Sequence, residues 1–249
     1  MAISTNSVIH YTELLEDLKG IITCHGFRIK YCIEEIKLQN PTPLNAAFPM
    51  VSFCDIPLSG IKNHIETYGS YGIGLSKTWA KRSGLNPVHY IERESRFAES
   101  LHEQTKRIYL LAGSVHEDRT LAMEFARQLA YKKNYEGRLV RGKINTDSYR
   151  FYDEREWRFC ALEADINGEP MFIIGSTYLL DKTSFNDKIK DCYLKFSHED
   201  ISYLIVDNED EIPELLKTLN DVYEGIITSK DLKILSTKIL TKQQIWNDF

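Results

Sequence analysis

The sequence has few cysteines and no long apolar run. Its five cysteines are scattered over 249 residues without a Cys-x-x-Cys pair, which argues against a secreted disulfide framework and a structural zinc site. No stretch of about 18 consecutive apolar residues occurs, so no transmembrane helix is predicted. The first residues also lack the basic and apolar segments of a signal peptide. Together these absences predict a cytoplasmic protein with no membrane partner.

The chain also lacks an excess of basic charge. It carries 31 Lys and Arg against 36 Asp and Glu, a formal net charge of −5. Such a balance disfavours a general electrostatic grip on nucleic acid or on an anionic membrane. Nucleic acid is therefore expected only as the acceptor of a chemical modification, bound along a local basic track. That track would need Lys132 and Lys133 together with the basic run at 138–143.

No internal repeat and no low-complexity linker divides the chain, so we expect one domain over residues 1–249. The prolines and asparagines of 38–49 predict a loop, and a helical pattern occupies about 96–136 with a break near Gly113 and Ser114. Strands are expected at 7–12, 49–57, 71–76, 88–91, 156–162, 171–174, 192–196 and 203–206, helices at 13–23, 58–67 and 213–219, and a strand and short helix in the tail. This order predicts an α+β fold with central mixed or antiparallel sheets, flanking helices and a helical insert.

Polar side chains mark the ends of two expected strands near the N-terminus. His10, Tyr11 and Thr12 end the first strand, where the period of two places His10 and Thr12 on one face. A histidine that bonds to a nearby backbone group would explain His10 without any function. Thr12 also resembles the N-cap of the following helix. Asp55, between a buried strand and a proline, is typical of a turn residue, although it could orient a catalytic neighbour.

Glycines and tyrosines alternate in the strand expected at 71–76. Gly72 and Gly74 lie inside it and Gly69 precedes it, without the βαβ context of a dinucleotide fingerprint. Glycine inside a strand often marks a β-bulge or a close approach of a ligand to the backbone. With Tyr68 and Tyr71 beside these glycines, a flat ring could stack on the strand. Tyrosines that belong to the core are the alternative.

An acidic and basic series opens the strand expected at 156–162. Glu154, Glu156 and Arg158 would share one face of that strand, and Trp157 and Phe159 would face the core. An exposed ion pair is the simplest explanation of the series. A metal-dependent nuclease could use the same acids, but the usual lysine is missing from the motif, and we expect no metal site.

Several blocks of the sequence occur in the order found in one bacterial family. They are IHYT and LKGIIT near the start, PMVSFCDIPLS and YGIGLSK in the middle, YDEREWRF later, and ILTKQQIWNDF at the end. In these blocks the chain resembles the AbiGi-type abortive infection proteins, over most of its length and least at about 96–140. The resemblance implies antiviral defence, on the antitoxin side of a toxin–antitoxin pair. The implied partner is a nucleotidyltransferase-like toxin encoded beside this protein.

A weaker similarity links the same blocks to ADP-ribosyltransferase-like folds, which have a split sheet and bind NAD. By that similarity His10 would contact the ribose, Tyr71 or Tyr68 would stack on nicotinamide, and Glu156 would hold the ribose hydroxyl, with Glu154 as the second choice. A carboxylate there would stabilise the oxocarbenium-like centre that forms when nicotinamide leaves. The residues expected to touch the cofactor are His10, Tyr11, Thr12, Tyr68, Tyr71 and Arg158. Arg158, or alternatively Arg28, would bind the pyrophosphate through its guanidinium group.

Two functions therefore remain open at the level of the sequence. One is an enzyme of phage defence that uses NAD for ADP-ribosyl transfer or cleaves it. The other is an antitoxin that neutralises its toxin by binding, without catalysis.

Overall fold

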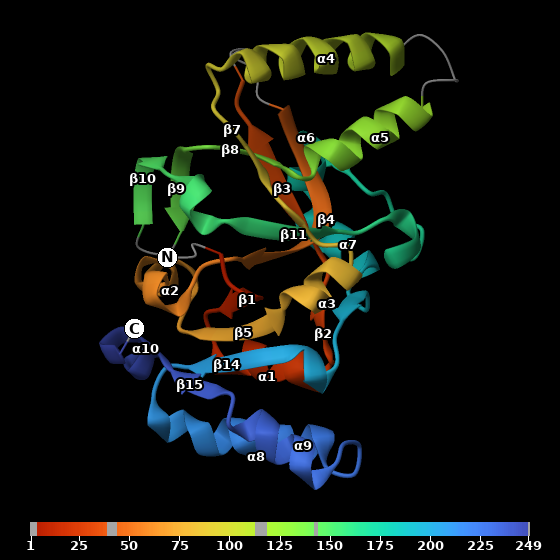
Figure 1. The fold of residues 1–249 in the computed structure, drawn as a ribbon. Coiled ribbons are helices and arrows are strands. Elements are labelled where there is room, and N and C mark those ends of the chain that lie inside the picture. The colour runs from red at the N-terminus through yellow and green to blue at the C-terminus, as the bar shows by residue number, and fades with distance from the viewer. Residues whose placement is uncertain (1–3, 39–43, 113–118, 142–143, 249) are drawn as a thin grey trace. The chain divides into compact units, whose positions relative to one another are not determined.

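The computed structural model describes residues 4–38, 44–112, 119–141 and 144–248. Within them, helices and short strands form an α+β structure with mixed sheets (Figure 1). The chain divides into two compact units. The first unit comprises Met1–Arg28, Ser52–Leu85 and Tyr193–Phe249, and the second comprises Ile29–Val51 and Asn86–Cys192. The expected α+β class is confirmed, and the expectation of one domain over 1–249 stays a prediction.

The first unit contains a mixed sheet in the order β15-β14-β5-β1. The strands are β1 (Ser7–Thr12), β5 (Tyr71–Ser76), β14 (Ile201–Val206) and β15 (Ile239–Thr241). β5 runs antiparallel to both β1 and β14, whereas β15 is parallel to β14. β1 also pairs with the end of β4 (Leu44–Cys54), at Ile9 and Cys54. A separate ladder joins β2 (Gly26–Arg28) to β13 (Tyr193–Lys195).

Helices and an apolar cluster complete the first unit. The helices are α1 (Leu15–Thr23), α2 (Lys62–Tyr68), α3 (Lys77–Arg82), α8 (Ile212–Tyr223), α9 (Ser229–Ser236) and α10 (Lys242–Asp248). α1 buries Leu18 and Ile22 and packs against α8. The core cluster consists of Ile9, Cys54, Ile56, Ile61, Ile65, Ile205 and Ile245. Burial of these branched apolar side chains is the main force that holds the sheet to its helices.

The first helix begins and ends differently from what its sequence predicts. Thr12 is not the N-cap: it pairs with Tyr71 as the last residue of β1, and its hydroxyl donates to the carbonyl of Leu14. At the other end, the sequence predicts that a left-handed Gly26 ends the helix. Instead His25 adopts the left-handed conformation, with φ of 46°, and Gly26 already belongs to β2. Thr12 and Gly26, which the local pattern assigns to the two ends of the helix, are therefore both paired in strands.

The second unit is built around the first part of β4. Strand β3 (Lys30–Ile36) pairs with β4 from Lys30 opposite Met50 to Ile36 opposite Leu44. β12 (Ile173–Ile174) also pairs with β4, and β11 (Glu156–Cys160) lies between β4 and β6 (Asn86–Pro87). The loop expected at 38–49 is therefore wrong for 44–49, because these residues gain a strand on each side. Its part at 39–43 lies outside the described residues.

Within its described residues, two smaller ladders and four helices complete the second unit. β7 (His89–Ile91) is parallel to β8 (Lys132–Asn134), and β9 (Gly137–Arg141) forms a hairpin with β10 (Ile144–Tyr149). The helices are α4 (Arg96–Ala112), α5 (Arg119–Leu129), α6 (Gly175–Leu180) and α7 (Lys182–Lys188). α4 and α5 confirm the helical insert, although its end at 132–134 is strand β8. The break expected near Gly113 and Ser114 lies outside the described residues.

Short 3-10 turns link several of these elements, at Leu58–Gly60, Phe151–Glu154, Glu163–Asp165, His198–Asp200 and Glu209–Glu211. α4 and α5 pack together over a cluster that includes Ile36, Ile91, Leu101 and Phe125. Among the described residues, no helix has the length and apolarity needed to cross a membrane.

Candidate functional site

The eight residues singled out from the sequence fall in different units of the structure. His10, Tyr11, Thr12, Tyr68 and Tyr71 belong to the first unit, and Glu154, Glu156 and Arg158 belong to the second. The three residues of the second unit lie together in one buried group of charged side chains. Those of the first unit are engaged in several distinct contacts.

Arg158, on β11, is the centre of the charged group. Its side chain has no solvent exposure. Its Nε and Nη2 donate to the two carboxylate oxygens of Glu156, at 2.7 and 3.1 Å, and Nη2 also donates to Glu34 Oε1 at 2.7 Å. Nη1 donates to the carbonyl of Ala130 at 2.7 Å. All three guanidinium nitrogens are thus engaged, so binding a pyrophosphate would require these contacts to open.

Lys133, on β8, joins the two acids of the sequence motif. Its Nζ donates to Glu154 Oε2 at 2.7 Å and to Glu156 Oε2 at 3.0 Å, and it lies 4.7 Å from the centre of the Phe151 ring. The backbone N–H of Glu156 donates to the hydroxyl oxygen of Tyr90 at 2.8 Å. Both the backbone and the carboxylate of Glu156 are therefore held. We call Glu34, Lys133, Glu154, Glu156 and Arg158 the ion cluster.

The ion cluster contains three carboxylates and two cations, so it has one negative charge in excess if all five are ionised. Burial alone would lower the pKa of Lys133 and Arg158, but the surrounding glutamates raise both above their ordinary values. Burial raises the pKa of Glu34, against the lowering effect of Arg158 and Lys133. The cations are thus firmly charged, and Glu34 takes up a proton more readily than an ordinary exposed glutamate does.

The orientation of β11 differs from the sequence prediction. Glu156 and Arg158 are buried, whereas Trp157 and Phe159, expected to face the core, are only half-buried. Glu154 is not on the strand, since it ends the turn Phe151–Glu154 before Arg155, which is left-handed with φ of 45°. The exposed ion pair is therefore wrong: charged side chains from β3 and β8 satisfy this face of β11 internally. The motif carried no signal for Lys133 or Glu34.

His10 has the contacts that its simplest explanation predicts. Its Nδ1 lies 2.8 Å from the carbonyl oxygen of Ser52. The ring is half-buried between Phe27 and Phe53, with ring centres 5.1 and 5.6 Å away. A backbone group thus partners this histidine, and whether it also contacts a ribose stays a prediction.

The tyrosines of the first unit have partners of their own. The Tyr71 hydroxyl donates to Glu211 Oε1 at 2.7 Å. Burial, together with this hydrogen bond, raises the pKa of Tyr71 to about 12. Tyr68 stacks on His64 with ring centres 4.7 Å apart. Burial also raises the pKa of Tyr11, whose ring centre lies 6.0 Å from that of His64.

Tyrosine rings of the protein itself cover the glycines of β5. A Cβ atom at Gly74 would lie 2.3 Å from the ring of Tyr203, and one at Gly72 would lie 3.2 Å from the ring of Tyr11. The close approach of a ligand stays a prediction, and in the structure an internal aromatic ring lies next to each of the two glycines. Tyr203, on the neighbouring strand β14, had no signal in the local motif.

Asp55 anchors the beginning of the chain within the first unit. Its carboxylate accepts hydrogen bonds from Ser4 Oγ at 2.7 Å, the backbone N–H of Thr5 at 2.9 Å and Lys77 Nζ at 2.6 Å. Burial alone would raise the pKa of Asp55, but these three donors lower it below its ordinary value. These partners lie 22 to 51 residues away from Asp55, so they are not the local contacts of a turn residue, and the sequence did not indicate Lys77 as the partner.

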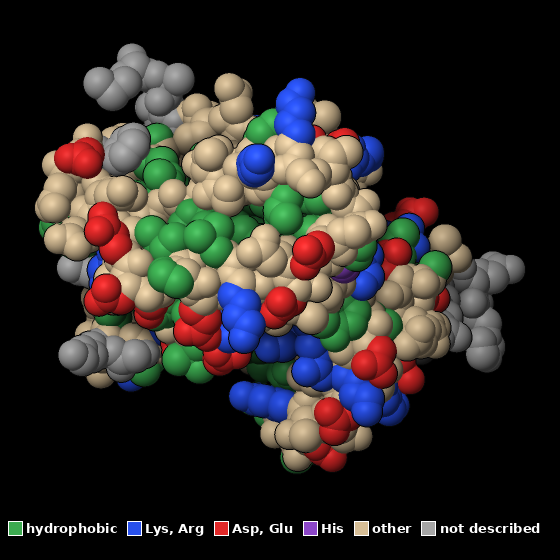
Figure 2. Space-filling view, turned by 90° about the horizontal axis from the view of Figure 1, so that it is seen from below, with side chains coloured by type: hydrophobic (Ala, Val, Ile, Leu, Met, Phe, Trp, Pro, Cys, Tyr) green, Lys and Arg blue, Asp and Glu red, His purple; other side chains and the backbone are tan. Residues whose placement is uncertain are grey.

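The basic track weighed from the sequence is only partly exposed. Lys132 is buried and donates to the carbonyl of Gln128, and Lys133 belongs to the ion cluster. Arg138 and Arg141 on β9 are exposed, while 142–143 lie outside the described residues. On the face drawn in Figure 2, basic side chains lie beside acidic ones. Among the described residues, no group of three or more His, Cys, Asp or Glu is arranged to hold a metal ion.

The fold and its charged interior define an α+β protein whose second unit encloses a buried ion cluster. Residues 26–207 match the model of the family described as abortive phage resistance protein AbiGi, antitoxin. That match spans more than half of the chain. The chain therefore belongs to the AbiGi family, which confirms the resemblance seen in its sequence blocks, and phage defence is the setting of the family.

A relative supports the same conclusion. The abortive phage resistance protein AbiGi of Lactococcus lactis subsp. cremoris is 26% identical over 242 residues, which cover 87% of this chain and 96% of the relative. No solved structure matches this chain. The family match includes the whole ion cluster but begins after His10, Tyr11 and Thr12. An ADP-ribosyltransferase-like fold thus has no support from solved structures.

Proposed function

We propose that this protein is an antitoxin of a phage-defence pair, which neutralises a toxin encoded beside it by binding and without catalysis. The observation that carries the proposal is the engagement of Glu154 and Glu156 in the ion cluster. Both oxygens of Glu156 accept hydrogen bonds from Arg158, and one also accepts from Lys133. The family description, antitoxin, agrees with a binding function.

Catalysis would make different demands on these carboxylates. A glutamate that stabilises a cationic transition state must face the substrate, in a position where its negative charge is available. The Glu156 side chain is only 8% exposed and already neutralised by two cations. Breaking those contacts would remove one of the two carboxylates that neutralise the buried Arg158, and loss of a buried partner costs up to about 3–5 kcal/mol. The arrangement therefore favours a structural role for Glu156.

The ion cluster suits the scaffold of a binding protein. It ties together three strands, since Glu34 comes from β3, Lys133 from β8, and Glu156 and Arg158 from β11. A hydrogen-bonded charged network fixes the strands in one register because any slip would leave a charge unpaired. The toxin would then contact exposed side chains carried on this rigid unit.

Growth of bacteria that express the neighbouring gene provides the test. We expect arrested growth with the toxin alone and restored growth when this protein is co-expressed. Glu156→Gln should still restore growth, since it changes no surface that meets the toxin, and Glu154→Gln serves as the matched control. Urea unfolding and the amount of soluble protein are measured for each variant. If a folded Glu156→Gln variant failed to restore growth while Glu154→Gln succeeded, the non-catalytic proposal would be overturned.

An NAD-dependent enzyme is the second candidate, and the position of Glu156 favours it. Glu156 is the first residue of β11, as the similarity to ADP-ribosyltransferases requires, and Glu154 lies beside it on the same lysine. The test is incubation of purified protein with NAD, with nicotinamide release and thermal stability measured together. We expect neither release nor a thermal shift. Release that disappears in Glu156→Gln would establish the enzyme instead.

A further inference from the structure

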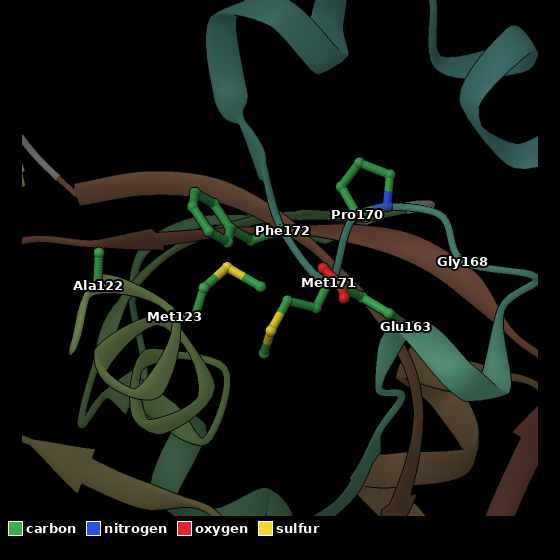
Figure 3. A pocket seen from close by; sticks show the side chains of 7 residues that line it. All are labelled: Ala122, Met123, Glu163, Gly168, Pro170, Met171 and Phe172. Atoms are coloured by element: carbon green, nitrogen blue, oxygen red, sulfur yellow. The ribbon is translucent and has the colours of Figure 1, made fainter. Parts of the chain in front are cut away.

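A cavity of about 340 Å³ opens on the second unit, beside helix α5 (Figure 3). α5 contributes two lining residues, and the segment between β11 and β12 contributes the others. Met123 and Met171 extend into the same space, with Phe172 beside them. The lining residues are Ala122, Met123, Glu163, Gly168, Pro170, Met171 and Phe172.

The walls of this cavity are apolar and adaptable. Phe172 packs against the core cluster of Phe48, Met50 and Ala130, so the floor belongs to the hydrophobic interior. Two methionines line the space, and their unbranched thioether chains can adjust to guests of different shape. Leu121 and Leu162, next in sequence to lining residues, are 42% and 43% exposed. Together these side chains can receive an apolar group from outside.

The charged residues in and next to the lining are mainly acidic, with Arg127 on α5 as a basic neighbour. Glu163 is the charged residue in the lining, and its side chain makes no ion pair within the described part of the chain. Glu124 follows Met123 on α5 and is exposed, and Asp165 is exposed two residues after Glu163. Asp165 accepts from the backbone of Leu162, and nearby Glu169 pairs with Lys188. An occupant with positive charge next to its apolar group therefore complements the site.

We propose that this cavity is a docking site for the toxin, and that it takes an apolar side chain of the toxin next to a Lys or Arg. The apolar side chain would lie between Met123, Met171 and Phe172, and the cation would meet Glu163. Anchors of this kind, a buried side chain ringed by polar contacts, dominate the affinity of protein interfaces. The proposal rests on the proposed antitoxin function, because it assumes a protein partner.

The four methionines of the sequence make a direct test available. The protein is labelled with ¹³C at the methionine methyl groups, and the purified product of the neighbouring gene is added stepwise. We expect the Met123 and Met171 methyl signals to shift or broaden at saturation. Met50, which is 3% exposed and belongs to the cluster behind Phe172, does not line the cavity and should shift less than Met123 and Met171.

A charge reversal at Glu163 gives an independent measurement. Glu163→Lys should weaken binding of the same toxin by about tenfold, since it places a cation against a cation. Glu103→Lys on α4 changes the same charge at another exposed position and should bind like the wild type. Toxin binding with unmoved Met123 and Met171 signals and an unaffected Glu163→Lys variant would overturn the docking site and leave the antitoxin proposal standing. No binding by the wild type would overturn both.

Discussion

The two compact units differ in the side chains that pack against their strands. In the first unit, the rings of Tyr11 and Tyr203 lie over Gly72 and Gly74 and occupy the space that a side chain at these glycines would need. In the second unit, the face of β11 buries the fully enclosed Arg158 among glutamates. Tight apolar packing tolerates no added volume, whereas a charged interior tolerates no lost partner. Each unit should therefore fail under a different kind of substitution.

Removal of the Arg158 charge should have the largest effect. Arg158→Met keeps much of the side-chain volume but leaves Glu34 and Glu156 buried without their main cation. We expect a loss of about 3–5 kcal/mol in the free energy of unfolding, measured by urea titration. Arg93→Met is the control, because Arg93 and its partner Glu94 are both exposed and such pairs contribute about 0–1 kcal/mol. Equal losses in the two variants would show that the buried ion pairs of Arg158 contribute no more to stability than the exposed pair of Arg93 and Glu94.

A methyl group at Gly74 tests the first unit. In Gly74→Ala the new Cβ would meet the Tyr203 ring at 2.3 Å, so the ring or the strand must move. We expect a loss of about 1–3 kcal/mol in the free energy of unfolding, as for other overpacked sites. The double variant Gly74→Ala, Tyr203→Leu should lose less than the sum of the two single variants. Simple additivity would mean that the two groups do not meet.

The pH dependence of stability should have opposite signs at two buried acids. The pKa of Asp55 is lowered in the folded protein, so its stabilising contribution is present above pH ~3.9 and is lost as the pH falls. The pKa of Glu34 is raised, so its contribution is full below pH ~4.3 and is lost as the pH rises.

Unfolding free energies between pH 6 and pH 3 measure this difference. The advantage of the wild type over Asp55→Asn should shrink as the pH falls, and its advantage over Glu34→Gln should grow. If the difference in unfolding free energy between the wild type and each variant changed in the same direction with pH, the assignment of one lowered and one raised pKa would be contradicted.

The smallest effect is expected at Gly20, where the first unit leaves space. Gly20 lies within α1, and a Cβ there would have no neighbour within 4 Å. Gly20→Ala should therefore raise the free energy of unfolding by about 0.5–1 kcal/mol, because alanine favours the helix and restricts the unfolded chain. A loss of stability at Gly20 would indicate that the effect at Gly74 reflects glycine in general and not the Tyr203 contact.

The local sequence was sufficient to predict those helices and strands whose own residues show a regular apolar or β-branched pattern. β-branched and aromatic runs correctly predicted β1 and β5, and apolar spacing correctly predicted α4 and α5. β3 escaped prediction because charged residues interrupt it, and 44–49 was assigned to a loop because of the prolines and asparagines of 38–49. Both segments are strands because they pair with each other. Pairing between distant segments overrides local propensity.

The candidate site was harder to predict for the same reason. The spacing of Glu156 and Arg158 correctly placed them on one strand face, yet it could not tell whether that face was buried. The answer depends on Lys133, 23 residues from Glu156, and on Glu34, 124 residues from Arg158. Likewise the glycines of β5 were interpreted as space for a ligand, whereas the ring next to Gly74 comes from Tyr203 on a strand far along the chain.

The division of the chain also bears on how the protein is made. The backbone passes from one unit to the other after Arg28, Val51, Leu85 and Cys192. During synthesis, the whole second unit leaves the ribosome before the first unit receives β14, the strand between β5 and β15. The second unit, with its charged interior and the cavity beside α5, can thus be complete while the first still lacks the middle of its sheet. A nascent chain stalled after Cys192 would already carry every residue of that cavity.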